Sequence, residues 1–146
     1  MLLNYQGSVI AALLGLALAA YFANRILSIE VTDNKVQSLS DAIRKGSMAF
    51  LKRQYSWVSI FVVVLAVLIS TLTDWGYPWG SLAFVGGALF SSLAGFIGMR
   101  IATAANGRTT EAARDGGTLK ALPVAFRGGA VMGFSVAGLG LLGVAL

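Results

Sequence analysis

The chain has 146 residues, of which 57% are hydrophobic and 12% are charged, whereas about 25% of the residues of a soluble domain are charged. It contains no cysteine and no histidine, which excludes disulfide bonds, thiolate or imidazole metal sites, and Ser-His or Cys-His catalytic pairs within this chain. The net charge of +5 comes from basic residues confined to two stretches, and this placement argues against a nucleic-acid partner.

Four segments without a charged residue divide the chain, and each is close to the length of about 20 residues that spans a bilayer as a helix. They are Leu2–Asn24, Gln54–Thr73, Trp75–Met99 and Gly128–Leu146. The pattern predicts an all-α integral membrane protein, a single membrane region with four transmembrane helices. We expect spans at about residues 4–25, 54–74, 79–101 and 124–146, with the connections 26–53 and 102–123 on one side.

The first span has two interpretations, a cleaved signal peptide or a membrane anchor. Its one basic residue, Arg25, follows the apolar run, whereas the basic region of a signal peptide precedes it. Small residues in "ALAAYFANR" would suit a signal peptidase, but the charge distribution favours the anchor.

The connection 26–53 contains a predicted helix. Ser38 and Asp41 have the spacing of a capping box. Apolar residues then recur with helical periodicity on one face, at Leu39, Ile43, Gly46 and Phe50. This helix would either lie on anionic headgroups or extend the second span into the cytoplasm and pack on neighbouring helices. The extension is favoured, because Met48–Leu51 runs into the span without a helix breaker.

The stretch "DWGYPWG", residues 74–80, predicts a tight hairpin between the second and third spans, because Pro78 and two glycines interrupt helices. Aromatic rings that favour the headgroup level lie at the ends of these spans, at Trp57, Trp75, Tyr77 and Trp79.

Small residues spaced four apart form a stripe on each of the last two spans. The third span carries Ala83, Gly87, Ser91 and Gly95, and the fourth carries Ala125, Gly129, Gly133 and Ala137. Stripes of this kind let helix backbones approach closely in lipid. We therefore expect these eight residues to be helix-packing positions, although glycine and alanine are also simply common here.

The polar connection 102–123 contains "RTTEAARDG", which predicts a short helix capped by Thr109, with Glu111 in its first turn and an end at Gly116–Gly117. Two acids without a histidine make a poor catalytic set. "GLGLLG" at 138–143 matches a dinucleotide fingerprint only as a string, since no strand precedes it and no acid follows. "FRGGA" at 126–130 could hold a phosphate at a helix start, but an arginine there more often marks the membrane boundary.

The charges predict the orientation in the cell (inner) membrane. All eleven basic residues lie between the first and second or between the third and fourth uncharged segments, at Arg25, Lys35, Arg44, Lys45, Lys52 and Arg53, and at Arg100, Arg108, Arg114, Lys120 and Arg127. Basic connections stay in the cytoplasm, which places both termini outside. Every acid lies outside the spans, and ion carriers need ionisable groups within the membrane. These helices alone are therefore not expected to conduct ions.

Residues 91–143 resemble the third and fourth helices of the membrane-bound, ion-pumping pyrophosphatases. The motifs "AGFIGM", "AN.RT.EAAR" and "AF.GGAVMG" occur in the order and spacing of that family, and "IRKGSMAFLKRQY" resembles its approach to the second helix. With the first span in register, the resemblance covers nearly the whole chain.

The resemblance implies a protein that cleaves pyrophosphate to phosphate on the cytoplasmic side and moves protons or sodium outward. It implies magnesium as a cofactor, with potassium as a further candidate, and a homodimeric assembly. It implies a bundle of sixteen helices in which these are the first four, in the outer ring. The family's catalytic, substrate and metal sites lie on later helices, so none is expected here. The chain would be an N-terminal scaffold piece, truncated at its C-terminal end and inactive alone, with the polar stretch 102–117 bracing the bundle.

Two other classes are alternatives. A small four-helix multidrug exporter has a similar size, but it would need an acid embedded in the membrane. A non-catalytic assembly subunit fits the small-residue stripes equally well, and the family motifs argue against it.

Overall fold

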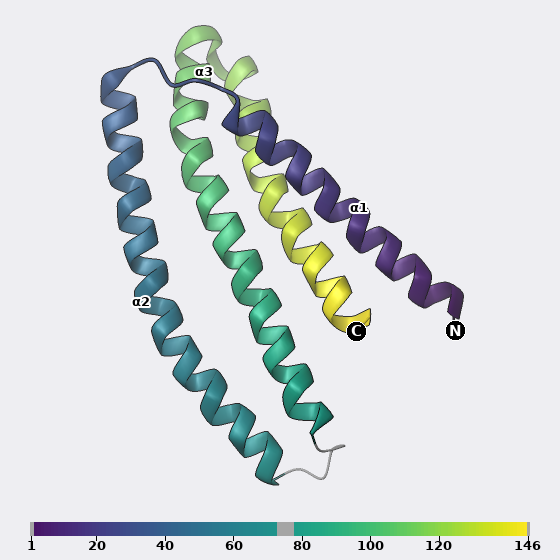
Figure 1. The fold of residues 1–146 in the computed structure, drawn as a ribbon. Helices are drawn as coiled ribbons and strands as arrows, with labels where there is room; N and C mark the ends of the chain where they lie inside the picture. Colours follow the sequence, from purple (N-terminus) through teal and green to yellow (C-terminus); the bar gives the residue numbers. More distant parts are fainter. Residues whose placement is uncertain (1, 73–77, 146) are drawn as a thin grey trace.

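The computed structural model describes residues 2–72 and 78–145, and the regular elements in these two ranges are α-helices. They are α1 (Leu2–Leu27), α2 (Asn34–Leu72) and α3 (Trp79–Ala145) (Figure 1). All three are long and apolar enough to cross a membrane. The prediction of an all-helical chain with membrane-length apolar helices is confirmed.

The longest helix, α3, is broken at two glycines. Gly116 has φ −166° and ψ 22°, and Gly117 has φ 65° and ψ −159°. The positive φ of Gly117 is a conformation that glycine adopts readily because it has no Cβ. The chain reverses there, so that the two limbs, residues 79–115 and 118–145, run side by side (Figure 1). The predicted helix end at this glycine pair is confirmed, and the expected third and fourth spans lie one on each limb.

The prediction of a separate short helix within residues 108–116 is wrong about where the helix starts. Residues 79–115 form one helix, and Thr109 lies well inside it, not at an N-cap. The alanines of "IATAAN" are strong helix formers and nothing in this stretch breaks the helix. The third span therefore continues as a helix into the polar connection.

The second helix begins earlier than the predicted capping box. The Asp33 carboxylate caps it, with Oδ1 accepting hydrogen bonds from the backbone N–H of Lys35 at 2.7 Å and of Val36 at 3.2 Å. Ser38 lies inside the helix and donates to the Lys35 carbonyl, so the capping box at Ser38 and Asp41 is wrong. The cytoplasmic-extension interpretation is confirmed in one respect, because α2 is continuous from the connection into the span.

The hairpin predicted for "DWGYPWG" falls mostly on residues 73–77, outside the described ranges. The first limb of α3 starts directly after Pro78, whose carbonyl accepts from the Leu82 N–H at 3.2 Å. The rings of Trp57 and Trp79 are exposed, as expected of aromatic side chains at the membrane interface.

Both α1 and α2 pack on α3, and within the described ranges they do not pack on each other. The core cluster joins α1 to both limbs of α3, and its members are Ala19, Ile26, Ile101, Ala105 and Val131. Glycines permit the closest approaches: a Cβ at Gly98 would lie 2.7 Å from Met132, and one at Gly138 would lie 3.0 Å from the Ala12 carbonyl oxygen.

The predicted small-residue stripes lie mostly outside these contacts. A Cβ at Gly95 would meet the Tyr55 hydroxyl at 2.9 Å, but one at Gly87, Gly129 or Gly133 would meet no described atom within 4 Å. The other stripe members are exposed in this chain, namely Ala83, Ser91, Ala125 and Ala137. The helices of this chain therefore pack mainly through the adjacent faces of α3. That these eight residues are helix-packing positions remains a prediction.

Candidate functional site

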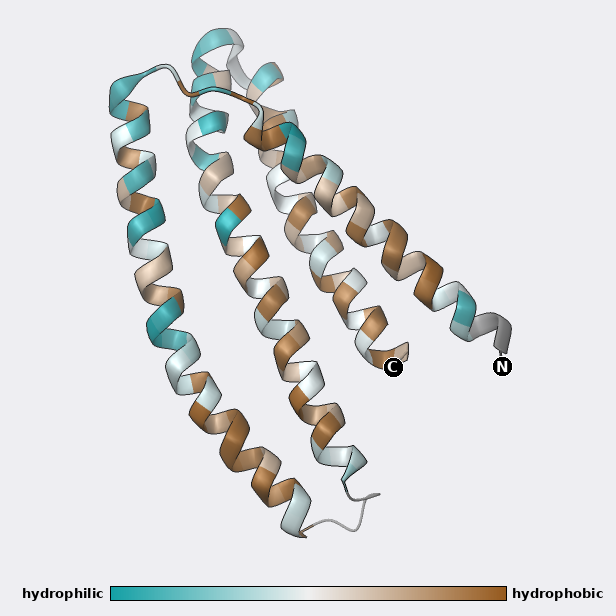
Figure 2. Cartoon of the chain, viewed as in Figure 1, coloured by the Kyte–Doolittle hydropathy of each residue, from teal (hydrophilic) through white to brown (hydrophobic). Residues whose placement is uncertain are grey.

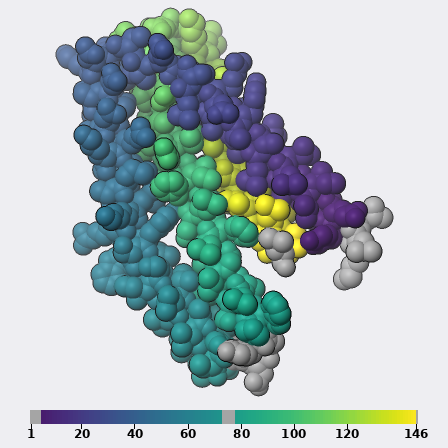
Figure 3. Space-filling model, viewed as in Figure 1, coloured from purple at the N-terminus to yellow at the C-terminus, as the bar shows by residue number. Residues whose placement is uncertain are grey.

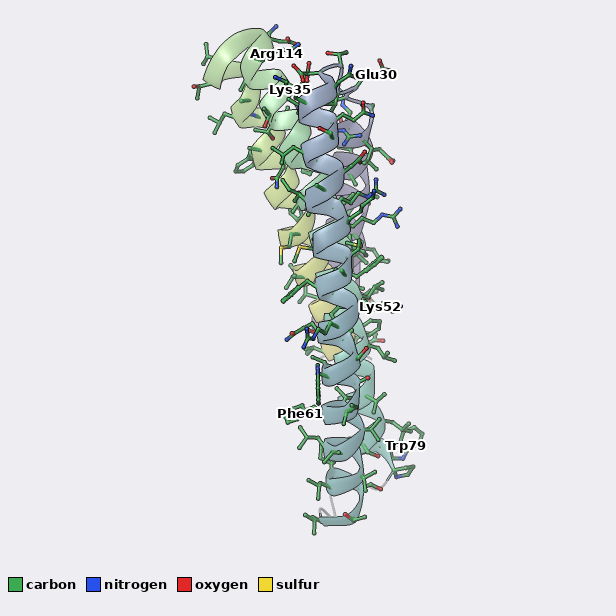
Figure 4. All side chains as sticks on the ribbon, turned by 90° about the vertical axis from the view of Figure 1, so that its left-hand side faces the viewer. Glu30, Lys35, Lys52, Phe61, Trp79 and Arg114 are labelled. Carbon is green, nitrogen blue, oxygen red and sulfur yellow. The ribbon has the colours of Figure 1, made fainter. Side chains whose placement is uncertain are left out.

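Hydrophilic residues gather at one end of the molecule, where α1 connects to α2 and where the two limbs of α3 meet (Figure 2). In Figure 4, Glu30, Lys35 and Arg114 lie at this end, whereas Phe61 and Trp79 lie toward the opposite end. The candidate site is therefore the contact between the α1–α2 loop and the polar part of α3.

Glu111 is the buried charged group of this end, with 4% of its surface exposed. Its Oε1 accepts a 2.6 Å hydrogen bond from the Thr32 hydroxyl and lies 3.3 Å from Nη2 of Arg114. Its Oε2 is buried and has no hydrogen-bond partner among the described residues. Glu111 thus joins the loop to α3 through one of its two oxygens.

Arg114 also forms an ion pair with Asp33, the residue that caps α2. The backbone N–H groups of Val36 and Lys35, and to a smaller extent the charge of Arg114, hold the pKa of Asp33 below its ordinary value. Asp33 is therefore ionised at neutral pH, and its carboxylate both starts α2 and contacts α3.

Arg108 binds the end of α1. Its Nε donates to the Ile29 carbonyl at 2.9 Å and its Nη2 to the Leu27 carbonyl at 3.4 Å, while Nη1 donates to Ala104 within α3 at 2.9 Å. Carbonyls at a helix C-terminus lack intrahelical partners, and a basic side chain satisfies them favourably. Burial, and next the nearby Arg44, lower the pKa of Arg108, but a guanidinium stays charged in proteins.

Gly107 lets α2 approach this part of α3. A Cβ at position 107 would lie 2.2 Å from Oγ and 3.1 Å from Cβ of Ser40. Gly107, Arg108, Glu111 and Arg114 have helical spacing, so one face of α3 contacts both the loop and α2.

The acids of this end are spread among several contacts. The described residues contain no group of three or more acidic side chains that could hold a metal, and Asp33 and Glu111 already share the Arg114 guanidinium. A cleft of about 430 Å³ beside Arg108 has Glu30, Asp41 and Arg44 in its wall, so its two acids balance its two guanidiniums. Magnesium ligands are therefore not assigned to this segment.

A neutral polar contact joins two helices within their apolar part. The Tyr55 hydroxyl donates a 2.7 Å hydrogen bond to the Ser92 carbonyl, joining α2 to the first limb of α3. Gly95 leaves the space that this ring occupies.

Sequence reasoning identified the polar stretch and missed its partners. Arg108, Glu111 and Arg114 are three residues apart and share one face of the continuous helix. The expected helix start at Thr109 obscured this relation, and nothing local indicated that Thr32 and Asp33 would bind them. The chemistry of Asp33 before "NKVQ" was the available signal, since an aspartate is a preferred N-cap.

The fold and the charge distribution define a segment of a multi-pass membrane protein, with a polar end that holds helices together. Residues 13–146 match the family described as inorganic H+ pyrophosphatase. The chain belongs to this family.

Curated relatives of the chain are named as pyrophosphate-energized pumps. The chain is 44% identical over 134 residues to a K(+)-insensitive pyrophosphate-energized proton pump of Methanosarcina mazei, covering 92% of this chain and 20% of the relative. It is 42% identical over 132 residues to such a proton pump of Moorella thermoacetica, covering 90% and 19%. It is 40% identical over 129 residues to a K(+)-stimulated pyrophosphate-energized sodium pump of Thermotoga maritima, covering 88% and 17%. The chain thus spans about a fifth of the length of these relatives.

Proposed function

We propose that this chain is the N-terminal scaffold segment of a longer ion pump, which couples hydrolysis of pyrophosphate to phosphate with outward transport of protons or sodium. The observation that carries the proposal is the family match over residues 13–146, nearly the whole chain. The relatives' names include both proton and sodium pumps, so the transported ion is left open.

The scaffold role follows from what the described residues contain. The four uncharged segments of the expected spans carry no acid, and a path for ions through a membrane needs ionisable groups to replace hydration. Two acids of the polar end, Asp33 and Glu111, are engaged in contacts that join the α1–α2 loop to α3. Magnesium, which the full-length pump would use with pyrophosphate, would be bound by residues outside this segment. The relatives' names distinguish stimulation by potassium from insensitivity to it, and potassium remains a candidate cofactor.

In this proposal the segment contributes four membrane spans, with α3 supplying two of them on either side of Gly116–Gly117. They would be the first four, outer-ring helices of a sixteen-helix bundle. Both termini lie outside, and the connections 26–53 and 102–123 face the cytoplasm of the cell membrane, in accordance with their basic residues. The full-length protein forms a homodimer, and the exposed stripes pack on its other helices.

The polar end acts as a brace on the cytoplasmic side. Arg108, Glu111 and Arg114 hold the loop between α1 and α2 against α3. These residues position helices, and hydrolysis and ion transport take place in other parts of the pump.

Magnesium-dependent phosphate release tests the proposal. Membranes that contain the 146-residue chain alone should release no more phosphate from pyrophosphate than empty membranes, whereas membranes with the full-length protein should release it. Release by the chain alone that disappears in Glu111→Gln or Asp115→Asn would contradict the scaffold role. A full-length protein without hydrolysis would contradict the function itself.

A further inference from the structure

The apolar face predicted on the first part of α2 has no partner within residues 2–72 and 78–145, the part of the chain that the structure describes. Leu39, Ile43 and Phe50 are 63%, 42% and 58% exposed. An added Cβ at Gly46, which lies between them, would meet no described atom within 4 Å. These four residues are called the outer face of α2. They follow one another at intervals of four, three and four residues, so they form a single stripe.

A different face of α2 packs on α3. Ser40 contacts Gly107, Leu51 is buried, and Tyr55 binds the Ser92 carbonyl. These three residues are rotated by about 90–150° around the helix from the middle of the outer face. Figure 3 shows α2 along one edge of the molecule, with no other element beyond it. The outer face is thus a second apolar surface, separate from the one that holds α2 in place.

Lipid does not cover this surface in the proposed topology. At 1.5 Å per residue, the continuous helix places Leu39 about 22 Å and Ile43 about 16 Å beyond Gln54, where the second span begins. The headgroup layer on each side of a bilayer is only about 5–7 Å thick. The outer part of this face would therefore lie in water, and exposed apolar surface in water marks a protein interaction site.

We infer that the outer face of α2 binds a helix from the part of the full-length pump that lies outside this chain, an inference that rests on the proposed function. The chain spans about a fifth of its relatives, so most of such a protein is available to cover it. Open space at Gly46 accommodates a large apolar side chain of that helix. Lys35 and Arg53 flank the stripe, and neither forms an ion pair within the described ranges. The partner helix therefore carries carboxylates near both ends of the contact.

A second copy of this chain fits the surface less well. Two copies have the same orientation in a membrane, so a two-fold contact through α2 would pair parallel helices. Each Lys35 would then lie near its counterpart, and each Arg53 likewise, and like charges placed together oppose association.

Single cysteines on two faces of α2 test the inference by labelling with a water-soluble maleimide from the cytoplasmic side. Ile43→Cys lies on the outer face, and Lys45→Cys, at nearly the same height on the polar face, is its matched control. The 146-residue chain has no cysteine of its own, and cysteines elsewhere in the full-length protein are replaced by serine. In the chain alone both positions should react at similar rates. In the full-length protein, position 43 should react about tenfold more slowly than position 45, because burial restricts access.

Equal rates at the two positions in the full-length protein would overturn the inference. Protection of position 43 in the chain alone would also overturn it, because lipid or a second copy would then be the cover. Phosphate release by the unsubstituted full-length protein is measured on the same membranes, and its absence refutes the proposed function, not the packing. A photo-crosslinking residue at position 39 identifies the partner. Attachment to a peptide outside residues 1–146 supports the inference, and attachment to a second copy of this segment contradicts it.

Discussion

Substitution of Gly128 by alanine tests the close contact between the two limbs of α3. A Cβ at position 128 would lie 2.9 Å from the Cβ of Ala105, and a methyl group fixed to the backbone cannot rotate away. The limbs must separate by about 0.5–1 Å to restore an ordinary carbon–carbon contact of about 3.5–4.0 Å. Such overpacking costs about 1–3 kcal/mol, and the better helix propensity of alanine returns about 1 kcal/mol. We expect Gly128→Ala to lower the free energy of unfolding by up to about 2 kcal/mol.

Gly129→Ala is the matched control, because it gains the same helix propensity and its Cβ would meet no described atom within 4 Å. The difference between the two variants therefore isolates the overpacking cost of about 1–3 kcal/mol. Reversible unfolding of the 146-residue chain in mixed micelles, followed by helical circular dichroism, measures it. Adding Ala105→Gly to Gly128→Ala should restore the lost stability. Coincident unfolding midpoints for the two alanine variants would refute the contact between the limbs.

Three further outcomes are expected. Glu111→Ala should lower the free energy of unfolding by about 1–3 kcal/mol, because Thr32 loses a charged acceptor. Glu111→Gln should lower the free energy of unfolding by less, since it keeps an acceptor oxygen. Equal losses of stability in thermal unfolding would argue against this hydrogen bond. Because the pKa of Asp33 is lowered in the folded state, the ionised carboxylate stabilises the fold at pH values above the ordinary aspartate pKa of 3.8, and this contribution is lost as the pH falls through the lower folded pKa. Asp33→Asn should therefore reduce the loss of stability at acid pH in a series of unfolding midpoints measured against pH. An impermeant reagent applied to intact cells should label a cysteine at position 74 and not one at position 45, and the reverse pattern would invert the proposed orientation.

The helical content of this chain could be predicted because it depends on local sequence. Apolar runs of membrane length gave α1 and the apolar parts of α2 and α3, and the glycine pair at 116–117 gave the break. The start of α2 was harder. The spacing of Ser38 and Asp41 resembles a capping box, but Asp33 precedes it and caps the helix first. No residue between Asn34 and Ser38 prevents a helix, so the earlier cap determines the start.

The choice of packing face could not be made from the spacing of small residues. Glycines 128 and 129 are neighbours in sequence, yet one meets Ala105 and the other meets open space. A rotation of 100° around the helix separates them, so a run of small residues does not by itself show which face meets a neighbouring helix. What distinguishes the faces is the partner, and the partner of the predicted stripe on the second limb is not among the described helices.

The candidate site depended on contacts that are distant in sequence. The hydrogen bond from Thr32 to Glu111 joins residues 79 positions apart, and no local pattern encodes such a pairing. Its consequence follows from the packing. Because α1 and α2 each contact α3 and, among the described residues, not each other, their relative position depends on α3 and on the loop that links them. Arg108 holds that loop at the end of α1, and Arg114 holds it at the start of α2 through Asp33. Three side chains on one face of α3 thereby fix the loop between two helices that have no contact of their own.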